Sequence, residues 1–196
     1  MDILGEGLLG AIIGGAASLA ATYITLWSQK KKAAEEDRAR VKAVLQAIHV
    51  EIRTLYQLYD ATMPVKVHQL AEGQPLRVNY PIAQDYFTIY RENSHLIGHI
   101  PDAELRSAIV ACYMYTKSLV DTYRFNNDLV DGYDAAELAY KRAPTQPNDE
   151  EMRARLGAMV EYVDMIRRSH DAAIESFRRL DTMLTASQSC WNRDRV

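Results

Sequence analysis

Two histidines at metal-ligand spacing are the first candidates for chemistry. His95 and His99 are four residues apart, and on one continuous helix such a pair can ligate zinc. Gly98 and Pro101 follow closely, and these residues are typical of a helix end. No third ligand is fixed by the sequence. We therefore predict two surface or corner histidines and no metal site.

Arginine–histidine pairs are the second candidates, because helical ribonucleases of the HEPN type combine these residues at a set spacing. Arg91 precedes His95 by three intervening residues and His99 by seven, and neither spacing fits. Arg167 before His170 fits no better. The chain also holds no Gly-rich phosphate loop with lysine, no Gly-x-Ser-x-Gly elbow and no His-Glu-x-x-His motif. We predict no catalytic residue, no cofactor and no enzymatic activity.

Charge and cysteine content point to no special chemistry either. The formal net charge is −3 over 196 residues, so no global field attracts nucleic acid, and we expect no nucleic-acid partner. Cys112 and Cys190 lie far apart in the sequence and show neither disulfide nor metal spacing. We predict that both are structural or incidental thiols.

The N-terminal segment is the strongest signal in the chain. The run from Ile3 to Trp27 holds a single charge, Glu6, and about twenty apolar residues span a bilayer. Lys30, Lys31 and Lys32 follow it, and no basic residue precedes it. The positive-inside rule then predicts a single-pass anchor over residues 1–28 with its N-terminus outside. A cleaved signal peptide is the alternative, but it requires a basic N-terminal region.

Small residues recur along this predicted membrane helix. Residues four apart share one helix face, and small side chains allow close packing of helices in lipid. We predict self-association through this face, in which the hydroxyls bond across the interface or back to their own helix. The residues of the small-residue face are Gly7, Gly10, Ala11, Gly14, Gly15, Ser18 and Thr22.

The rest of the chain has helical periodicity and no alternating strand pattern. We predict an all-α fold with a charged stalk over residues 29–40, an antiparallel bundle of about four helices over 41–187, and a tail over 188–196. Two inner faces are clear. They are Val41, Val44, Leu45, Ile48, Ile52, Leu55 and Leu58 in the first helix, and Met152, Leu156, Met159, Val163, Ile166, Ala173, Phe177, Leu180 and Leu184 in the last.

Glycine and proline residues predict where the helices end. Pro64 ends the first cytoplasmic helix and is followed by an irregular stretch. A helix then runs from Pro81 to about Ile97. Another begins at Ile100-Pro101-Asp102, with acids in its first turn, and Asp131-Gly132 breaks it.

Clusters of aromatic and polar residues allow two interpretations each. Twelve tyrosines are present, and Tyr86, Tyr90, Tyr113 and Tyr123 are expected to cluster between helices. We predict that they form the edges of the core with their hydroxyls in solvent; a ligand-binding groove is the alternative. The polar segment 121–128 is predicted to form an inter-helix network or a partner surface.

One block of the sequence has a family resemblance. It reads Tyr90-x-x-Asn93-x-x-x-Ile97-Gly98-x-Ile100-Pro101-x-x-x-Leu105, then Ile109-Val110-x-x-Tyr113. This block resembles one in small bacterial and prophage-borne proteins that have an N-terminal membrane helix and a charged helical stalk. The resemblance implies that architecture and a bacterial inner-membrane setting, and it assigns no activity.

The same block has a physical interpretation as a corner between two helices. Tyr90 belongs to the helix, and Asn93 lies one turn before its end, where it is expected to bond the following loop. Gly98 is expected to supply a left-handed cap. Pro101 is expected to fix the entry of the next helix.

These features favour a membrane-anchored helical scaffold or interaction protein. Its expected partners are the lipid bilayer, further copies of itself and a protein bound to the cytoplasmic bundle. The alternative hypothesis is an oligomeric effector that forms a pore or perturbs the membrane in bacterial anti-phage or CRISPR-associated defence, by analogy of architecture alone. A helical enzyme with an unrecognised site is the third hypothesis.

Overall fold

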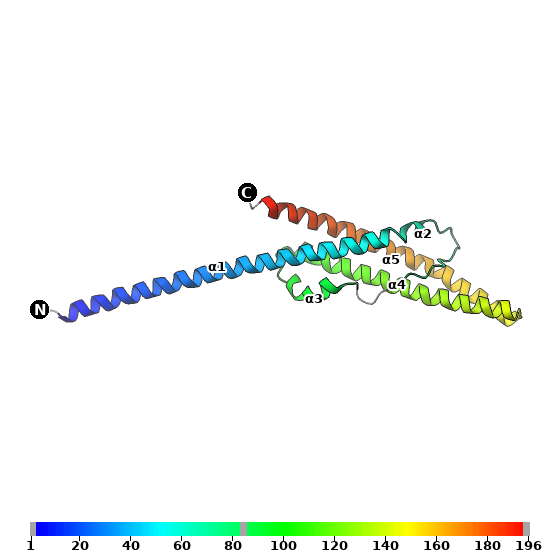
Figure 1. Ribbon diagram of the computed structural model, residues 1–196, viewed down its shortest axis with the longest axis horizontal. Coiled ribbons are helices and arrows are strands. Elements are labelled where there is room, and N and C mark those ends of the chain that lie inside the picture. The colour runs from blue at the N-terminus through cyan, green and yellow to red at the C-terminus, as the bar shows by residue number, and fades with distance from the viewer. Residues whose placement is uncertain (1–2, 83–85, 194–196) are drawn as a thin grey trace. The chain divides into compact units, whose positions relative to one another are not determined.

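The computed structural model consists of helices and their connections (Figure 1). It describes the backbone of residues 3–82 and 86–193, and the side chains of 18, 19, 21–82 and 86–187. No strand occurs in these ranges, which confirms the all-α prediction. The helices are α1 (Ile3–Asp60), α2 (Pro64–His68), α3 (Thr88–Ile97), α4 (Ala103–Arg142) and α5 (Gln146–Arg193).

The chain divides into two compact units, residues 1–44 and 45–196. The first unit is the N-terminal part of α1. Within it, the Thr22 hydroxyl donates to the Ser18 carbonyl oxygen at 2.9 Å, so it bonds back to its own helix. Among the residues that the structure describes, no helix has a window long and apolar enough to cross a membrane.

Most of the predicted membrane span lies outside the described side chains. Glu6, Gly7, Gly10, Ala11, Gly14 and Gly15 are among the undescribed ones. The described end of the span is exposed at Tyr23 and Trp27, and the Lys31 ammonium lies 5.8 Å from the centre of the Trp27 ring.

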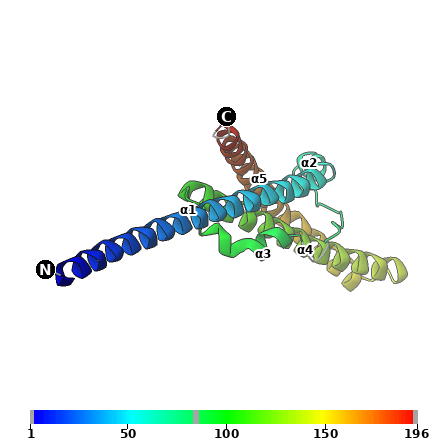
Figure 2. The same cartoon turned by 60° about the vertical axis from the view of Figure 1, so that its left-hand side comes forward.

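The second unit is built on α4 and α5, which run antiparallel and pack along each other (Figures 1 and 2). The part of α1 after Val44 packs on both, because Tyr56 stacks on Phe177 of α5 and the Tyr59 ring lies 6.0 Å from that of Tyr123 of α4. Apolar residues at helical spacing fill the core because each helix buries one stripe. Buried examples are Leu45, Ile48, Ile52, Ile109, Leu119, Met159, Ile166, Leu180 and Leu184.

The predicted break at Asp131-Gly132 is wrong, because α4 is continuous from Ala103 to Arg142. Gly132 faces α5, where an added Cβ would lie 3.6 Å from the Arg155 guanidinium. Packing against α5 outweighs the cost of about 1 kcal/mol for a glycine within a helix. The unit therefore has three long helical segments, with α2 and α3 as short additions, where an antiparallel bundle of about four helices was predicted.

Two other expectations about these helices are corrected. Leu58 and Leu156, expected on inner faces, are 62% and 37% exposed. The third predicted helix starts at Thr88 rather than at Pro81, and residues 74–82 form an extended segment bound to α4.

The corner between α3 and α4 is formed by a side-chain cap. Asp102 accepts hydrogen bonds from the backbone N–H groups of Glu104 and Leu105, which confirms the predicted helix start. Gly98 has φ −61°, so the expected left-handed cap is wrong. The chain leaves α3 through right-handed turns, in which the His99 N–H donates to the Leu96 carbonyl, and these need no left-handed residue.

Candidate functional site

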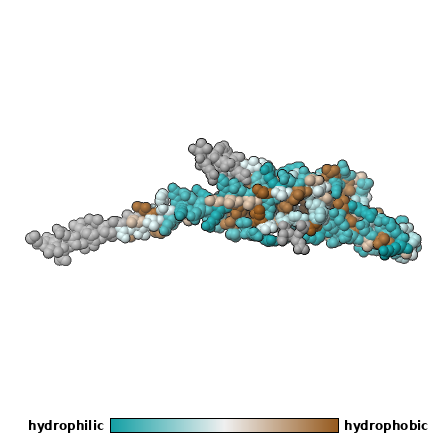
Figure 3. Space-filling model, in the orientation of Figure 1, coloured by the Kyte–Doolittle hydropathy of each residue, from teal (hydrophilic) through white to brown (hydrophobic). Residues whose placement is uncertain are grey.

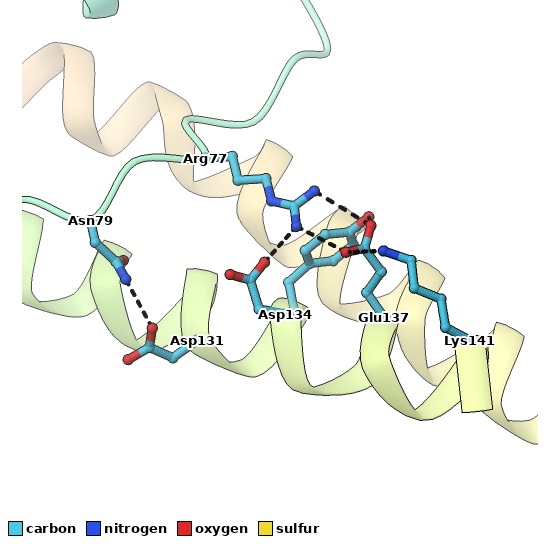
Figure 4. A network of polar contacts seen from close by, with 7 residues as sticks. Arg77, Asn79, Asp131, Asp134, Glu137 and Lys141 are labelled. Carbon is cyan, nitrogen blue, oxygen red and sulfur yellow. Dashed lines mark hydrogen bonds and ion pairs between the residues drawn. The ribbon is translucent and has the colours of Figure 1, made fainter. Parts of the chain in front are cut away.

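An extended segment of residues 74–82, here called the strap, lies along α4 (Figure 4). Asn127 binds it on both sides of one residue: its Oδ1 accepts from the Tyr80 N–H at 2.9 Å, and its Nδ2 donates to the Tyr80 carbonyl at 2.8 Å. Asn126, which is buried, donates to the Val78 carbonyl at 3.0 Å. These amides satisfy backbone groups that have no strand partner.

Charged side chains hold the strap further along α4 (Figure 4). Arg77 Nη2 lies 2.8 Å from Asp134 and 3.0 Å from Glu137, and Lys141 lies 2.9 Å from Glu137. The hydrogen bonds from Arg77, and then from Lys141, lower the pKa of Glu137 to about 2. Arg77, Asp134 and Lys141 are exposed and Glu137 is half-buried, so the contribution of these ion pairs to stability is small. They fix the direction of the strap, which runs antiparallel to α4.

The Tyr80 ring of the strap packs in the core beside Tyr59 and Tyr123. Its centroid lies 6.3 Å from that of the Tyr59 ring and 5.1 Å from that of the Tyr123 ring. Leu76 of the strap is buried in the same cluster. The polar segment 121–128 thus forms a network within the chain through Asn126 and Asn127, and the strap is its target.

An apolar cavity of about 80 Å³ opens beside Tyr80; we call it the trough. Its floor includes Ile52, Leu119 and Ala173, all buried. Figure 3 shows hydrophobic residues gathered where α1 and α4 lie in this unit. Aromatic rings wall the trough: Tyr56, Tyr59, Tyr80, Tyr86, Phe87, Tyr123 and Phe177.

A line of hydrogen bonds leads from the trough through the core. The Tyr59 hydroxyl lies 2.9 Å from that of Tyr123 and 2.6 Å from Nδ1 of His170. All three side chains are buried. Burial raises the pKa of Tyr59 and raises that of Tyr123 to about 12, so both stay protonated at neutral pH. Burial, and then His68, lower the pKa of His170.

A second cavity, of about 250 Å³, lies at the His170 end of this line. We call it the acidic pocket, because Asp60, Asp171 and Glu175 line it together with Arg178. Its remaining walls are Tyr56, Pro64, His68, His170 and Ile174. Tyr56 and Ile174 also line the trough, so the two cavities share a wall.

The predicted corner residues lie together near α3. The rings of Tyr90 and Tyr113 stack at 3.9 Å. Asn93 donates to the Ile89 carbonyl of its own helix rather than to the following loop. Glu51 of α1, which sequence reasoning missed, accepts from the Ile89 and Tyr90 N–H groups and from the Tyr113 hydroxyl. It caps α3 from another helix and so compensates for the absence of a local cap.

The four tyrosines expected in one cluster fall into two groups. Tyr90 and Tyr113 pack with Phe87 beside α3, whereas Tyr123 packs with Tyr59 and Tyr80. Tyr86 lines the trough with Tyr123.

The predicted thiols and histidines take no part in the trough or the acidic pocket. Cys112 is buried, and burial raises the pKa of its thiol to about 11, while the Cys190 side chain lies outside the described residues. His95 and His99 line neither cavity. Within the described ranges no group of three His, Cys, Asp or Glu side chains is arranged to hold a metal ion.

Of the residues in the hydrogen-bonded line Tyr123–Tyr59–His170, only His170 could have been recognised as a buried polar residue from the sequence. His170 stands between Ile166 and Ala173 at helical spacing, on the inner face of α5. A polar residue on an apolar face needs a buried partner. Its partner Tyr59 lies 111 residues away, and no local pattern identifies it.

Comparison with protein-family models, with curated proteins and with solved structures finds no match to this chain. The resemblance of the Tyr90–Tyr113 block therefore stays a prediction.

Proposed function

We propose that the chain is a non-enzymatic, membrane-anchored interaction protein. Residues 1–28 form the anchor, copies associate through its small-residue face, and the helical unit binds a protein partner on the cytoplasmic side of a bacterial inner membrane. The apolar run from Ile3 to Trp27 and the lysines that follow it support the anchor and its direction.

The trough is the observation that carries the binding role. Pockets for drug-sized ligands and cofactors measure roughly 300–1,000 Å³, whereas the trough measures about 80 Å³. A space of this size holds one side chain. Its aromatic walls suit an apolar side chain of a partner, since interface hot spots are apolar anchors in desolvated pockets. Leu58 on its rim is 62% exposed and extends the apolar surface outward.

Photo-crosslinking from the rim tests this role. A photoreactive amino acid in place of Leu58, in the full chain in its own membrane, should give one discrete adduct. Mass spectrometry should locate the crosslink next to an apolar partner residue. The substitution Ala173→Leu fills the trough from its floor and should reduce the adduct at least five-fold.

Two controls keep this result specific. Ala108→Leu adds the same volume at a buried position of α4 that does not line the trough, and it should leave the adduct unchanged. A photoreactive residue at Met165, which is exposed outside the trough, should give no such adduct. An adduct that persists in Ala173→Leu would contradict the proposal, as would the absence of any adduct from Leu58.

A further inference from the structure

His170 presents one ring nitrogen that the protein leaves unused. The residue is 3% exposed, and its Nδ1 is engaged by the Tyr59 hydroxyl. Its Nε2 has no hydrogen-bond partner in the described part of the chain. Every fully buried side-chain nitrogen or oxygen atom described there does have a partner. Nε2 is therefore not fully enclosed, and the acidic pocket is the cavity that His170 lines.

The charges around this nitrogen are also unpaired. Asp60 of α1 and Asp171, Glu175 and Arg178 of α5 line the acidic pocket, and none of them forms an ion pair with a described residue. Three carboxylates and one guanidinium thus line the pocket. The pocket thus attracts a cation, and its field acts near the partly desolvated wall formed by His170.

The arrangement of these groups indicates where the cation sits. Asp171 directly follows His170, whereas Arg178 lies seven residues further along α5, or about 10 Å at the rise of a helix. The end of the pocket beside Asp171 is therefore the more negative. Tyr56, Pro64 and Ile174 supply apolar wall, and the volume of about 250 Å³ suits a small molecule.

We propose that the acidic pocket binds a small organic cation, a primary ammonium compound with an apolar body. The ammonium group lies between Asp60 and Asp171 and donates a hydrogen bond to His170 Nε2. The apolar body packs against Tyr56 and Ile174. This site shares the wall of Tyr56 and Ile174 with the trough, but its charged groups and His170 do not line the trough, so its test does not depend on the proposed function.

The hydrogen bonds among His170, Tyr59 and Tyr123 allow the neutral imidazole tautomer that this binding needs, with the proton on Nδ1. When Nδ1 carries the proton and donates to the Tyr59 oxygen, the Tyr59 hydroxyl donates to Tyr123, and Nε2 is left as an acceptor. The lowered pKa of His170 keeps the ring neutral at pH 7, although Asp60 and Asp171 oppose that shift. His68 and Arg178 face the same pocket and act with it.

The test is a titration of the full chain in lipid nanodiscs with 2-phenylethylammonium chloride at pH 7.5. The readout is the ¹⁵N resonance of His170 Nε2, which reports on that atom and is insensitive to partition of the probe into lipid. We expect a saturable shift at millimolar or lower concentration. The neutral analogue 2-phenylethanol should bind at least ten-fold more weakly, because it lacks the charge.

Matched variants separate the roles of the pocket residues, with the resonance of a labelled Ile174 methyl group as readout. Asp171→Asn should weaken binding at least three-fold, whereas Asp164→Asn, on the same helix outside the pocket, should not. His170→Gln places an amide near the position of Nε2 and should retain binding. His170→Asn mimics only Nδ1 and should lose most of it.

Three results would overturn the proposal. The first is the absence of a saturable shift up to about 10 mM amine, because a dissociation constant above about 10 mM corresponds to very weak binding. The second is equal binding of the alcohol. The third is an affinity unaffected by Asp171→Asn.

Discussion

At the scale of single residues, His170 and Tyr59 form a buried polar contact in the helical unit. Both are buried, and each satisfies the other's hydrogen-bonding group at 2.6 Å. Loss of one partner leaves a buried polar group without a bond, which costs about 1–3 kcal/mol. This pair also gives the molecule a defined dependence of stability on pH.

Protonation of His170 should destabilise the folded chain. Burial lowers its pKa below the ordinary value of 6.5, so the unfolded state binds the proton more readily than the folded state. The contribution of the neutral imidazole is complete above pH 6.5 and is lost as the pH falls below it. Urea unfolding should show this decline between pH 7.5 and 5.5.

The variant His170→Gln isolates this effect. At pH 7.5 it should lower the free energy of unfolding by about 1–3 kcal/mol, and its decline toward pH 5.5 should be clearly shallower than that of the unaltered chain. An equal decline in both proteins would assign the pH dependence to other groups.

At the scale of elements, the strap depends on side chains rather than on a sheet. Asn127 holds both backbone groups of Tyr80. Asn127→Ala should lower the free energy of unfolding by about 1–3 kcal/mol and accelerate hydrogen exchange at the Tyr80 amide. The amide of Met159, in the core of α5, should accelerate only by the factor that the loss of global stability gives, and the Tyr80 amide by more.

Asn79 supplies the matched control for the strap. It is exposed and bonds only the Asp131 side chain, so Asn79→Ala should change stability by less than about 0.5 kcal/mol. Slow exchange at Tyr80 in Asn127→Ala would mean that the aromatic packing alone holds the strap.

Self-association through the small-residue face of the N-terminal helix can be tested by substitution. Gly10→Ile with Gly14→Ile places bulky side chains where two membrane helices are proposed to approach. Self-association in a membrane dimerisation assay should fall several-fold. Leu8→Ile with Ile12→Leu, which keeps the volume of the segment, should leave it unchanged. Association that survives the glycine substitutions would remove this face from the proposal.

Local sequence signals predicted the helices and their ends unevenly. The helical period of Leu45, Ile48 and Ile52 identified a buried face, and Asp102 identified a cap, because both are short-range features. Leu58 was expected on the inner face but is exposed, because the trough opens at this turn of α1. The continuity of α4 through Gly132 depends on packing against α5, which lies outside any local window.

The candidate sites were less predictable than the fold. Tyr123 and Tyr86 were expected in an aromatic cluster and do line the trough. The contacts that organise the sites join residues far apart in the sequence, such as Asn127 with Tyr80 and Tyr59 with His170. One sequence gives no register between such segments, so the two cavities emerged only from the folded chain.

At the scale of the whole molecule, we propose that residues 1–28 anchor a helical unit that has two cavities. The anchor rests on the apolar run from Ile3 to Trp27 and on its basic flank. The trough and the acidic pocket rest on the described residues 45–187. Binding in either cavity would then take place on a protein held at a membrane.

Membrane extraction tests the central claim most directly. The full chain, expressed in bacteria, should stay in the membrane pellet after washing at alkaline pH, which releases peripheral proteins. Ile12→Asp with Ala16→Asp places two charges in the middle of the span, each unfavourable by about 3 kcal/mol, and should shift the chain toward the supernatant. Release of the unaltered chain by the alkaline wash would contradict the account.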